Sequence, residues 1–449
     1  DRRRGRRYRK SHTQYALTGG KKVQSRSQDK IYYSLYDRLL SMKALAEAFV
    51  KVKKAKGSAG IDGQSIADFA ANVEEEIARL LRELREKTYR PLPVKRVTIE
   101  KPGGGERHLG VPAVRDRVVQ QALLNVIQPI FDPHFHPSSY GYRPGRSCHH
   151  AISKATRFIR DYELKWVVDM DLSKCFDTLD HDRIITCIRR RIADGSVLNL
   201  VRMFLCSGVM VDGSWQASEL GSPQGGVISP IIANIYLDDF DQFMKGRDHR
   251  IVRYADDILI LRRSKRGAEN ALKQASEFLE GELKLTVNRK KTHVTHSYRG
   301  VKFLGVVIQS RYTSIQAQKV EAFKRTVKAI TRRNSPVNLE KVIEDLNPRL
   351  RGFAGYFRIA NCKGVLKRLM EWIRRRLRAK QLKLWKKPAK LHRRLRQLGY
   401  RGEFDKIRMS SWRNSNSPLV NMALPNKYLK GLGLVDMVAV ETGFCLGDP

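Results

Sequence analysis

Apolar residues recur every three to four positions in the first third of the chain, which is the spacing of one buried helix face. One such stretch runs from near Tyr32 to about Val52, and another covers 65–87. The apolar positions of the second stretch lie on one face when the segment is helical, and they are Val73, Ile77, Leu80, Leu81 and Leu84. The pattern therefore predicts a helical N-terminal part, and residues 115–131 return to the same period.

A shorter period takes over between these helices and in the middle of the chain. Within 90–112, alternating apolar runs flank Gly103-Gly104-Gly105, which predicts a β-hairpin. Apolar and β-branched runs predict further strands, with helices between them, at 165–171, 208–211, 251–254, 258–262 and 302–308. This mixture of strands and helices predicts an α+β fold.

From 318 onward the pattern is again helical. The expected buried positions are Val320, Phe323, Val327, Ile330, Leu366, Leu369, Ile373 and Leu377. Arginines and lysines occupy the opposite faces. Pro388 interrupts the pattern, and 401–449 is expected to form short elements and loops. Residues 1–27 are polar and basic, which indicates a flexible arm.

Charge narrows the choice of partners. The 449 residues carry a formal net charge of +42, and the 35 residues of 363–397 include only one acid, Glu371. Basic residues spread over the whole chain favour a nucleic acid over an anionic membrane surface. At 41% hydrophobic the chain has enough apolar residues for packed cores, and it lacks a membrane span or a secretory signal, so a cytoplasmic protein is expected. The six cysteines show no zinc or disulfide spacing.

Clusters of acidic residues are unexpected in so basic a chain, because they would repel the phosphates of a nucleic acid unless a cation lay between them. The form Tyr-x-Asp-Asp occurs twice, at 236–239 and 254–257. The first copy follows a helix start at Pro230 with no strand after it, so we expect a helix carrying surface acids. The second lies between two apolar runs, which predicts a hairpin with Asp256 and Asp257 at its tip.

Another apolar strand ends in acids at Asp169 and Asp171, which share one face in extended geometry. If one of them joins Asp256 and Asp257, three carboxylates can bind two Mg²⁺ ions and support displacement at phosphorus. Any of these pairs taken alone is more often a surface feature. The strand contexts and the basic surroundings favour a catalytic site.

The segment GSPQGGVISP (221–230) places Gly225 and Gly226 in a loop before a helix. Bare backbone there would let a nucleobase or a sugar approach closely. A turn without any ligand explains the same residues equally well.

The order of these motifs resembles that of reverse transcriptases: WVVDMDLSKCFDTLDH (166–181), GSPQGGVISP, YADD, NRKKT (288–292) and FLG (303–305). KGSAGIDG (56–63) and LNPRLRGFAGYFRIA (346–360) further resemble the upstream loop and the maturase region of bacterial group II intron-encoded proteins. No endonuclease motif follows, so the chain resembles the class that lacks that domain.

The resemblance implies a right-hand polymerase, with fingers, a palm built on an antiparallel sheet, and a helical thumb. The implied boundaries are a basic arm at 1–27, fingers at 28–165, a palm at 166–315 with a fingers-contributed insertion at about 178–225, a thumb/maturase domain at 316–400, and a nucleic-acid-binding extension at 401–449.

Site residues follow from the same resemblance. The implied metal ligands, for two Mg²⁺ ions or for Mn²⁺ as a substitute, are Asp171, Asp256, Asp257 and the carbonyl of Leu172. Lys291 corresponds to the lysine that protonates the leaving pyrophosphate, and a surface lysine in a basic loop is the alternative interpretation. The implied nucleotide-binding residues are Lys101, Arg107, Phe176, Gln224 and Ala255, with Phe176 rejecting ribonucleotides by its bulk.

The basic helices correspond to the thumb, where the expected nucleic-acid contacts are Arg374, Arg375, Arg376, Arg378 and Lys380. The implied partners are an RNA template such as intron RNA, a DNA or RNA primer, target DNA and dNTPs. The sequence leaves three functions open: a mobile-intron polymerase that also assists splicing, a maturase that acts only by binding RNA, and a polymerase adopted by its host for DNA repair or phage defence.

Overall fold

The computed structural model describes residues 30–100, 106–211, 214–217, 220–222, 225–404 and 413–443. Lys101, Gln224 and the arm at 1–27 lie outside these residues, and for Arg107 only the backbone is described. In the described residues, no helix is both long and apolar enough to cross a membrane.

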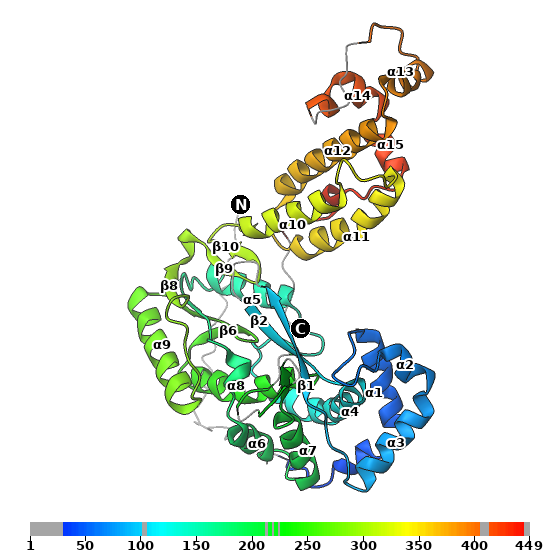
Figure 1. Cartoon of the computed structure of the whole chain (residues 1–449). Helices are drawn as coiled ribbons and strands as arrows, with labels where there is room; N and C mark the ends of the chain where they lie inside the picture. The colour runs from blue at the N-terminus through cyan, green and yellow to red at the C-terminus, as the bar shows by residue number, and fades with distance from the viewer. Residues whose placement is uncertain are drawn as a thin grey trace, which may run out of the picture.

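The N-terminal part is a group of helices beside a hairpin (Figure 1). Its helices are α1 (Met42–Ala55), α2 (Ile66–Ala71), α3 (Val73–Arg85) and α4 (Val114–Phe131). Strands β1 (Val94–Glu100) and β2 (Glu106–Val111) pair antiparallel, which confirms the predicted hairpin on either side of 101–105. Strand β1 also pairs in parallel with β4 (Val209–Val211), and β4 pairs antiparallel with β5 (Ser214–Gln216).

The central sheet has the strand order β6-β7-β3-β8. Its strands are β3 (Trp166–Met170), β6 (Arg250–Tyr254), β7 (Asp257–Arg262) and β8 (His293–His296), all paired antiparallel. The helices around it are α5 (Cys148–Arg160), α6 (His181–Arg189), α7 (Gly195–Leu205), α8 (Ser229–Gly246) and α9 (Lys265–Glu277). A small sheet follows, made of β9 (Val301–Phe303), β10 (Val306–Ile308) and β11 (Thr313–Ile315).

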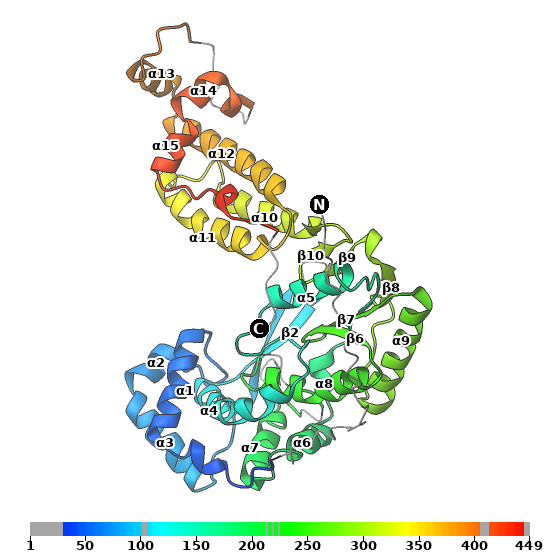
Figure 2. The same cartoon turned by 180° about the vertical axis from the view of Figure 1, so that it is seen from behind.

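The C-terminal helical region stands away from this body in both views (Figures 1 and 2). It contains α10 (Ala317–Ile330), α11 (Leu339–Phe357), α12 (Lys363–Trp385), α13 (Pro388–Gln397), α14 (Pro418–Ala423) and α15 (Asn426–Gly431). Pro388 is the first residue of α13, where its missing N–H costs no helical hydrogen bond, so the interruption predicted there is a helix start.

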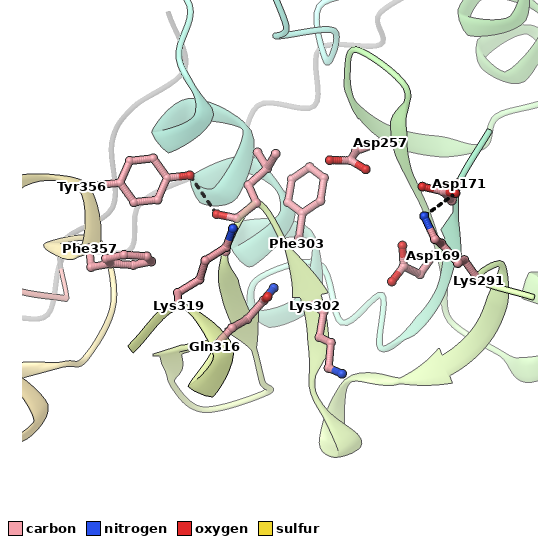
Figure 3. Close-up of a pocket in the computed structure, with 12 residues that line it drawn as sticks. Asp169, Asp171, Asp257, Lys291, Lys302, Phe303, Gln316, Lys319, Tyr356 and Phe357 are labelled. Carbon is pink, nitrogen blue, oxygen red and sulfur yellow. Dashed lines mark hydrogen bonds and ion pairs between the residues drawn. The ribbon is translucent and has the colours of Figure 1, made fainter. Parts of the chain in front are cut away.

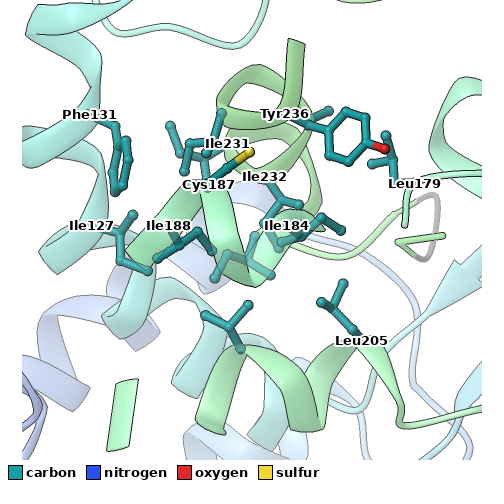
Figure 4. Close-up of a cluster of buried hydrophobic side chains, with 14 of the residues drawn as sticks. Ile127, Phe131, Leu179, Ile184, Cys187, Ile188, Leu205, Ile231, Ile232 and Tyr236 are labelled. Atoms are coloured by element: carbon teal, nitrogen blue, oxygen red, sulfur yellow. The ribbon is translucent and has the colours of Figure 1, made fainter. Parts of the chain in front are cut away.

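Both faces of the central sheet are buried, which explains why its strands are continuously apolar. One face, with Val168 and Ile260, joins a core shared with the N-terminal helices and with α6 to α8. Figure 4 shows part of this core, where α4, α6 and α8 meet. The other face, with Val167 and Leu259, joins a core that continues through β9 to β11 into α10, α11 and α12. The C-terminal region is therefore packed through this core against the sheet face that carries Val167 and Leu259.

Two predicted helical stretches differ from the structure. The stretch from Tyr32 becomes a regular helix only at Met42, after Ser41 accepts a hydrogen bond from Ala44 N as an N-cap. Tyr32 instead forms a parallel bridge with Ile192. The stretch at 65–87 is two helices, because Asn72 leaves helical geometry between α2 and α3 (φ −122°, ψ 35°).

The strand predicted at 302–308 is also two strands. Leu304 (φ 45°) and Gly305 (φ 83°) both have left-handed backbone, and this turn reverses the chain so that β9 pairs with β10. The motif FLG thus forms the turn of a hairpin, and residues 303–305 line the same cavity as Asp171 and Asp257 (Figure 3).

Candidate active site

Two adjacent strands deliver the predicted carboxylates. Strand β3 ends at Met170, which pairs with Ile258 of β7, so Asp171 follows at the end of the sheet where Asp257 begins β7. Tyr254 pairs with Asp257, which leaves Ala255 and Asp256 as the two-residue loop of the predicted hairpin. Ala255 has the positive φ (57°) that tight hairpin loops require.

The side chains of Asp171 and Asp257 face a cavity of about 550 Å³ (Figure 3). Asp169, Asp171, Asp257 and Lys291 line one side of it. The residues opposite come from the β9–β10 turn and from the C-terminal region: Lys302, Phe303, Leu304, Gly305, Gln316, Lys319, Tyr356 and Phe357. Acids thus converge on one wall, and lysines and aromatic rings on the other.

Charge is crowded on the acidic wall. Burial raises the pKa of Asp257 to about 6, and the negative charges of Asp256, Asp171 and Asp169 add to the shift. Burial likewise raises the pKa of Asp169 to about 6, with Asp171 contributing to the rise. Each of these carboxylates would ionise more readily if a cation lay beside it.

Asp171 is held in place by the segment that follows η4 (278–282) and leads into β8. Its carboxylate accepts a hydrogen bond from Asn288 Nδ2 (2.9 Å) and pairs with Lys291 Nζ (3.2 Å), while its backbone N–H donates to Thr292 Oγ1 (3.2 Å). Lys291 is 67% exposed, so its ammonium can reach the cavity. Leu172, by contrast, is buried and forms an isolated bridge with Val287.

The donor set of hard carboxylate oxygens suits a divalent ion such as Mg²⁺. Asp171 and Asp257 line the same cavity, whereas Asp256 is not among the lining residues and acts on Asp257 and Cys175 through its negative charge. In the described part of the chain, no three acidic, histidine or cysteine side chains are close enough together to hold a metal. The described side chains therefore offer the oxygen ligands that a divalent ion requires, but they are not already arranged as a set of three ligands.

A buried ion pair supports the hairpin loop, and sequence reasoning missed it. Arg253 and Asp241 are both fully buried, and the guanidinium donates to both carboxylate oxygens (2.9 and 2.6 Å). Its remaining nitrogen donates to Asn234 Oδ1 (3.0 Å) and to the carbonyl of Ala255 (3.2 Å). Asn234 Nδ2 in turn donates to the carbonyl of Gly141. The loop that carries Asp256 is thus tied to helix α8.

Phe176 and the GSPQGG segment lie together. Phe176 is 8% exposed, and its carbonyl accepts from Ser222 N (2.7 Å). At Gly225 (φ 119°), a Cβ would lie 2.5 Å from the carbonyl oxygen of Gly110 in β2. Glycine is therefore needed there for close packing of two backbones, independent of any ligand. Gln120, another residue that the sequence did not single out, accepts hydrogen bonds from the N–H groups just after this loop.

The first Tyr-x-Asp-Asp copy, at 236–239, lies in helix α8, as expected. Its acids are half-buried and not freely exposed, which corrects the prediction of surface acids. Asp239 pairs with Arg183 and Arg190, and burial raises the pKa of Asp238 to about 6. These contacts explain the copy at 236–239 as a structural feature of the helix.

The five basic residues predicted as nucleic-acid contacts occupy different environments on α12. Arg375 is exposed, and Arg374 pairs with Asp436. Arg376 donates to Thr331, which stabilises the end of α10. Arg378 and Lys380 are buried, contrary to the surface position that the helical pattern suggested. They donate to main-chain carbonyls of Leu424, Arg332 and Ser335, so they hold the helices of this region together.

Comparison with known proteins agrees with this architecture. Residues 99–308 match the family model of the reverse transcriptase (RNA-dependent DNA polymerase), and residues 320–399 match that of the group II intron maturase-specific domain. The first match ends with strand β10, and the second begins within the first turn of helix α10.

Individual relatives point the same way. Protein YkfC of Escherichia coli is 35% identical over 334 residues, which cover 64% of this chain and 88% of YkfC. The group II intron-encoded protein LtrA of Lactococcus lactis is 28% identical over 366 residues, covering 67% of this chain and 60% of LtrA. A putative COX1/OXI3 intron 2 protein of Saccharomyces cerevisiae is 28% identical over 59% of this chain and 37% of its own length. The chain therefore belongs to the group II intron-encoded reverse transcriptases, RNA-directed DNA polymerases that carry a maturase domain.

Proposed function

We propose that this chain adds deoxynucleotides to a primer 3′ hydroxyl on an RNA template, and that Asp171, Asp256 and Asp257 bind two Mg²⁺ ions, or Mn²⁺ in their place. The observation that supports this assignment is the convergence of Asp171 and Asp257 from paired strands on one cavity. When bound, such ions lower the pKa of an attacking hydroxyl and neutralise charge that develops on the transferring phosphate.

The other residues have supporting roles in this proposal. Asn288 keeps the carboxylate of Asp171 oriented, and Lys291, as an exposed ammonium beside it, delivers a proton to the leaving pyrophosphate. Phe176, whose carbonyl accepts a hydrogen bond from Ser222 N of the GSPQGG segment, excludes a ribose 2′ hydroxyl by the bulk of its ring. The Leu172 carbonyl completes the ligand set, and Lys101, Arg107, Gln224 and Ala255 bind the incoming nucleotide.

Primer extension tests the polymerase assignment. Asp256→Ala and Asp257→Ala should each reduce incorporation on an RNA template by at least about 100-fold, because each removes a proposed ligand. Asp182→Ala is the matched control, since Asp182 is an exposed acid (83%) of helix α6 whose surface pair with Arg202 contributes little. Full activity in both ligand variants would contradict the proposal.

We further propose that the same chain assists splicing of a group II intron RNA, on the basis of the maturase-domain match at 320–399. In-vitro splicing of the parent intron at moderate salt should be faster with the protein present. Asp257→Ala should keep this stimulation, because the carboxylate is not needed for binding RNA. Splicing rates that do not change when the protein is added would count against the maturase role and leave the polymerase role intact.

A further inference from the structure

Tyr356 connects the C-terminal region to the active-site cavity. It is the penultimate residue of α11, in the segment that resembles a maturase region, yet its ring lines the cavity that holds Asp171 and Asp257. Its hydroxyl donates to the carbonyl of Leu304 (2.8 Å), as Figure 3 shows. Burial raises the pKa of Tyr356, so the phenol keeps its proton and remains a donor.

The turn that Tyr356 contacts depends on outside support. Leu304 has left-handed backbone, which a branched side chain adopts only at a cost. On one side, Gln316 holds the turn by donating to the carbonyls of Gly305 (3.1 Å) and Val306 (3.1 Å). On the other side, the Tyr356 hydroxyl supplies the bond to Leu304.

Tyr356 also has firm anchors of its own. Its carbonyl lies 2.6 Å from His149 Nε2, and His149 belongs to α5, which packs against strand β6 of the catalytic hairpin. Within α11, the rings of Tyr356 and Phe357 meet edge to face (4.8 Å), and Phe357 in turn contacts Phe353 (4.8 Å). A displacement of α11 would therefore move the 303–305 turn, and a displacement of the turn would move α11.

We propose that Tyr356 is a positioning residue that couples the C-terminal helical region to the 303–305 turn and thereby sets how tightly the cavity holds the primer strand. The turn and its neighbours Lys302 and Lys319 face the carboxylates across the cavity, where cationic side chains suit the sugar-phosphate backbone of a primer end. This inference rests on the proposed polymerase function.

Tyr356→Phe removes only the hydroxyl and is the decisive variant. We expect the KM for primer–template to rise about 3–10-fold, which corresponds to one lost hydrogen bond. Products made in the presence of a competitor that captures free enzyme should be shorter. The kcat for a single incorporation at saturating duplex and the KM for dNTP should change less than about twofold, because the carboxylates are untouched.

Two further variants separate positioning from stability. Tyr298→Phe makes the same change at a tyrosine that is 80% exposed, and it should behave as the parent protein. Ile77→Val removes a buried methyl group from the core around α3, away from every contact described for Tyr356. The inference is overturned if Tyr356→Phe keeps the parental duplex KM, if it lowers kcat alone, or if Ile77→Val at an equal loss of melting temperature raises the duplex KM as much. An inactive parent protein would instead contradict the polymerase function itself.

Discussion

The surroundings of Asp257 disfavour the ionised form of its carboxylate when no cation is bound. Its pKa of about 6 exceeds the ordinary aspartate value of 3.8. Between these two values the folded protein binds a proton more tightly than the unfolded chain, so the free energy of unfolding falls as the pH rises through this window. At neutral pH the ionised carboxylate of Asp257 therefore lowers the free energy of unfolding, and a bound cation would offset this loss.

Asp257→Asn should therefore raise the melting temperature at about pH 8, by roughly 1–2 °C, because it removes the repelled charge. Near pH 4.5 the parent is already protonated, and the two proteins should melt alike. Primer extension by the parent should decline as the pH falls through about 6, since a protonated carboxylate is a poor cation ligand. Thermal unfolding at both pH values provides the measurement, and a lower melting temperature for Asp257→Asn at pH 8 would refute the interpretation.

The Arg253–Asp241 pair allows stability and positioning to be measured separately. Arg253→Met alone leaves a buried carboxylate without its partner and should cost about 3–5 kcal/mol. The double variant Arg253→Met/Asp241→Leu should regain most of this stability, since apolar replacements of buried pairs are often neutral or stabilising. Its incorporation rate should nevertheless stay at least about tenfold below that of the parent, because the Ala255 carbonyl has lost its donor.

Denaturant unfolding and single-nucleotide incorporation on the same preparations test this expectation. A double variant with full stability and full activity would show that the donor from Arg253 is not needed to position the loop at Ala255. The same assays on Asp182→Ala give the baseline for losing a surface ion pair.

At the level of elements, the sequence correctly predicted the hairpin of β6 and β7, because the apolar runs on either side of YADD leave room only for a tight turn. It failed where one run hid a turn: Leu304-Gly305 inside 302–308 carries a single glycine as its only local signal. It also failed for contacts between distant elements. Nothing local distinguishes Arg253, which pairs with Asp241 in the core, from the many arginines that face solvent.

Gly225 illustrates how two such elements depend on each other. Gly225→Ala should push the GSPQGG loop away from β2, because the new Cβ would meet the carbonyl oxygen of Gly110. We expect the KM for dNTP to rise at least about threefold and the stability to fall by about 1–3 kcal/mol. Gly399→Ala is the matched control, since it has a similar left-handed backbone (φ 83°) with open space around it. Equal effects of the two substitutions would attribute the loss to backbone strain and not to the contact.

For the whole molecule, the net charge of +42 means that nucleic-acid binding should weaken steeply with salt. The structure adds that a basic residue on α12 does not automatically belong to the binding surface. Arg375 is exposed, whereas Lys380 is fully buried and donates to two main-chain carbonyls. The helical pattern could not separate them, because lysine and arginine look alike in sequence whether their heads reach solvent or the carbonyls of a neighbouring loop.

Binding of an RNA–DNA duplex at several salt concentrations distinguishes the two roles. If Arg375 contacts a phosphate, Arg375→Gln should reduce the slope of log affinity against log salt by about 0.7–0.9, with an unchanged melting temperature. Lys380→Met should leave that slope unchanged and instead destabilise the C-terminal region by about 1–3 kcal/mol, since two main-chain carbonyls lose the donor that the buried Lys380 supplies. A reduced slope for Lys380→Met at full stability would mean that the loop opens and the ammonium reaches the nucleic acid. Because the salt slope counts neutralised phosphates and the melting temperature reports packing, the two measurements assign each basic residue of α12 to the surface or to the core.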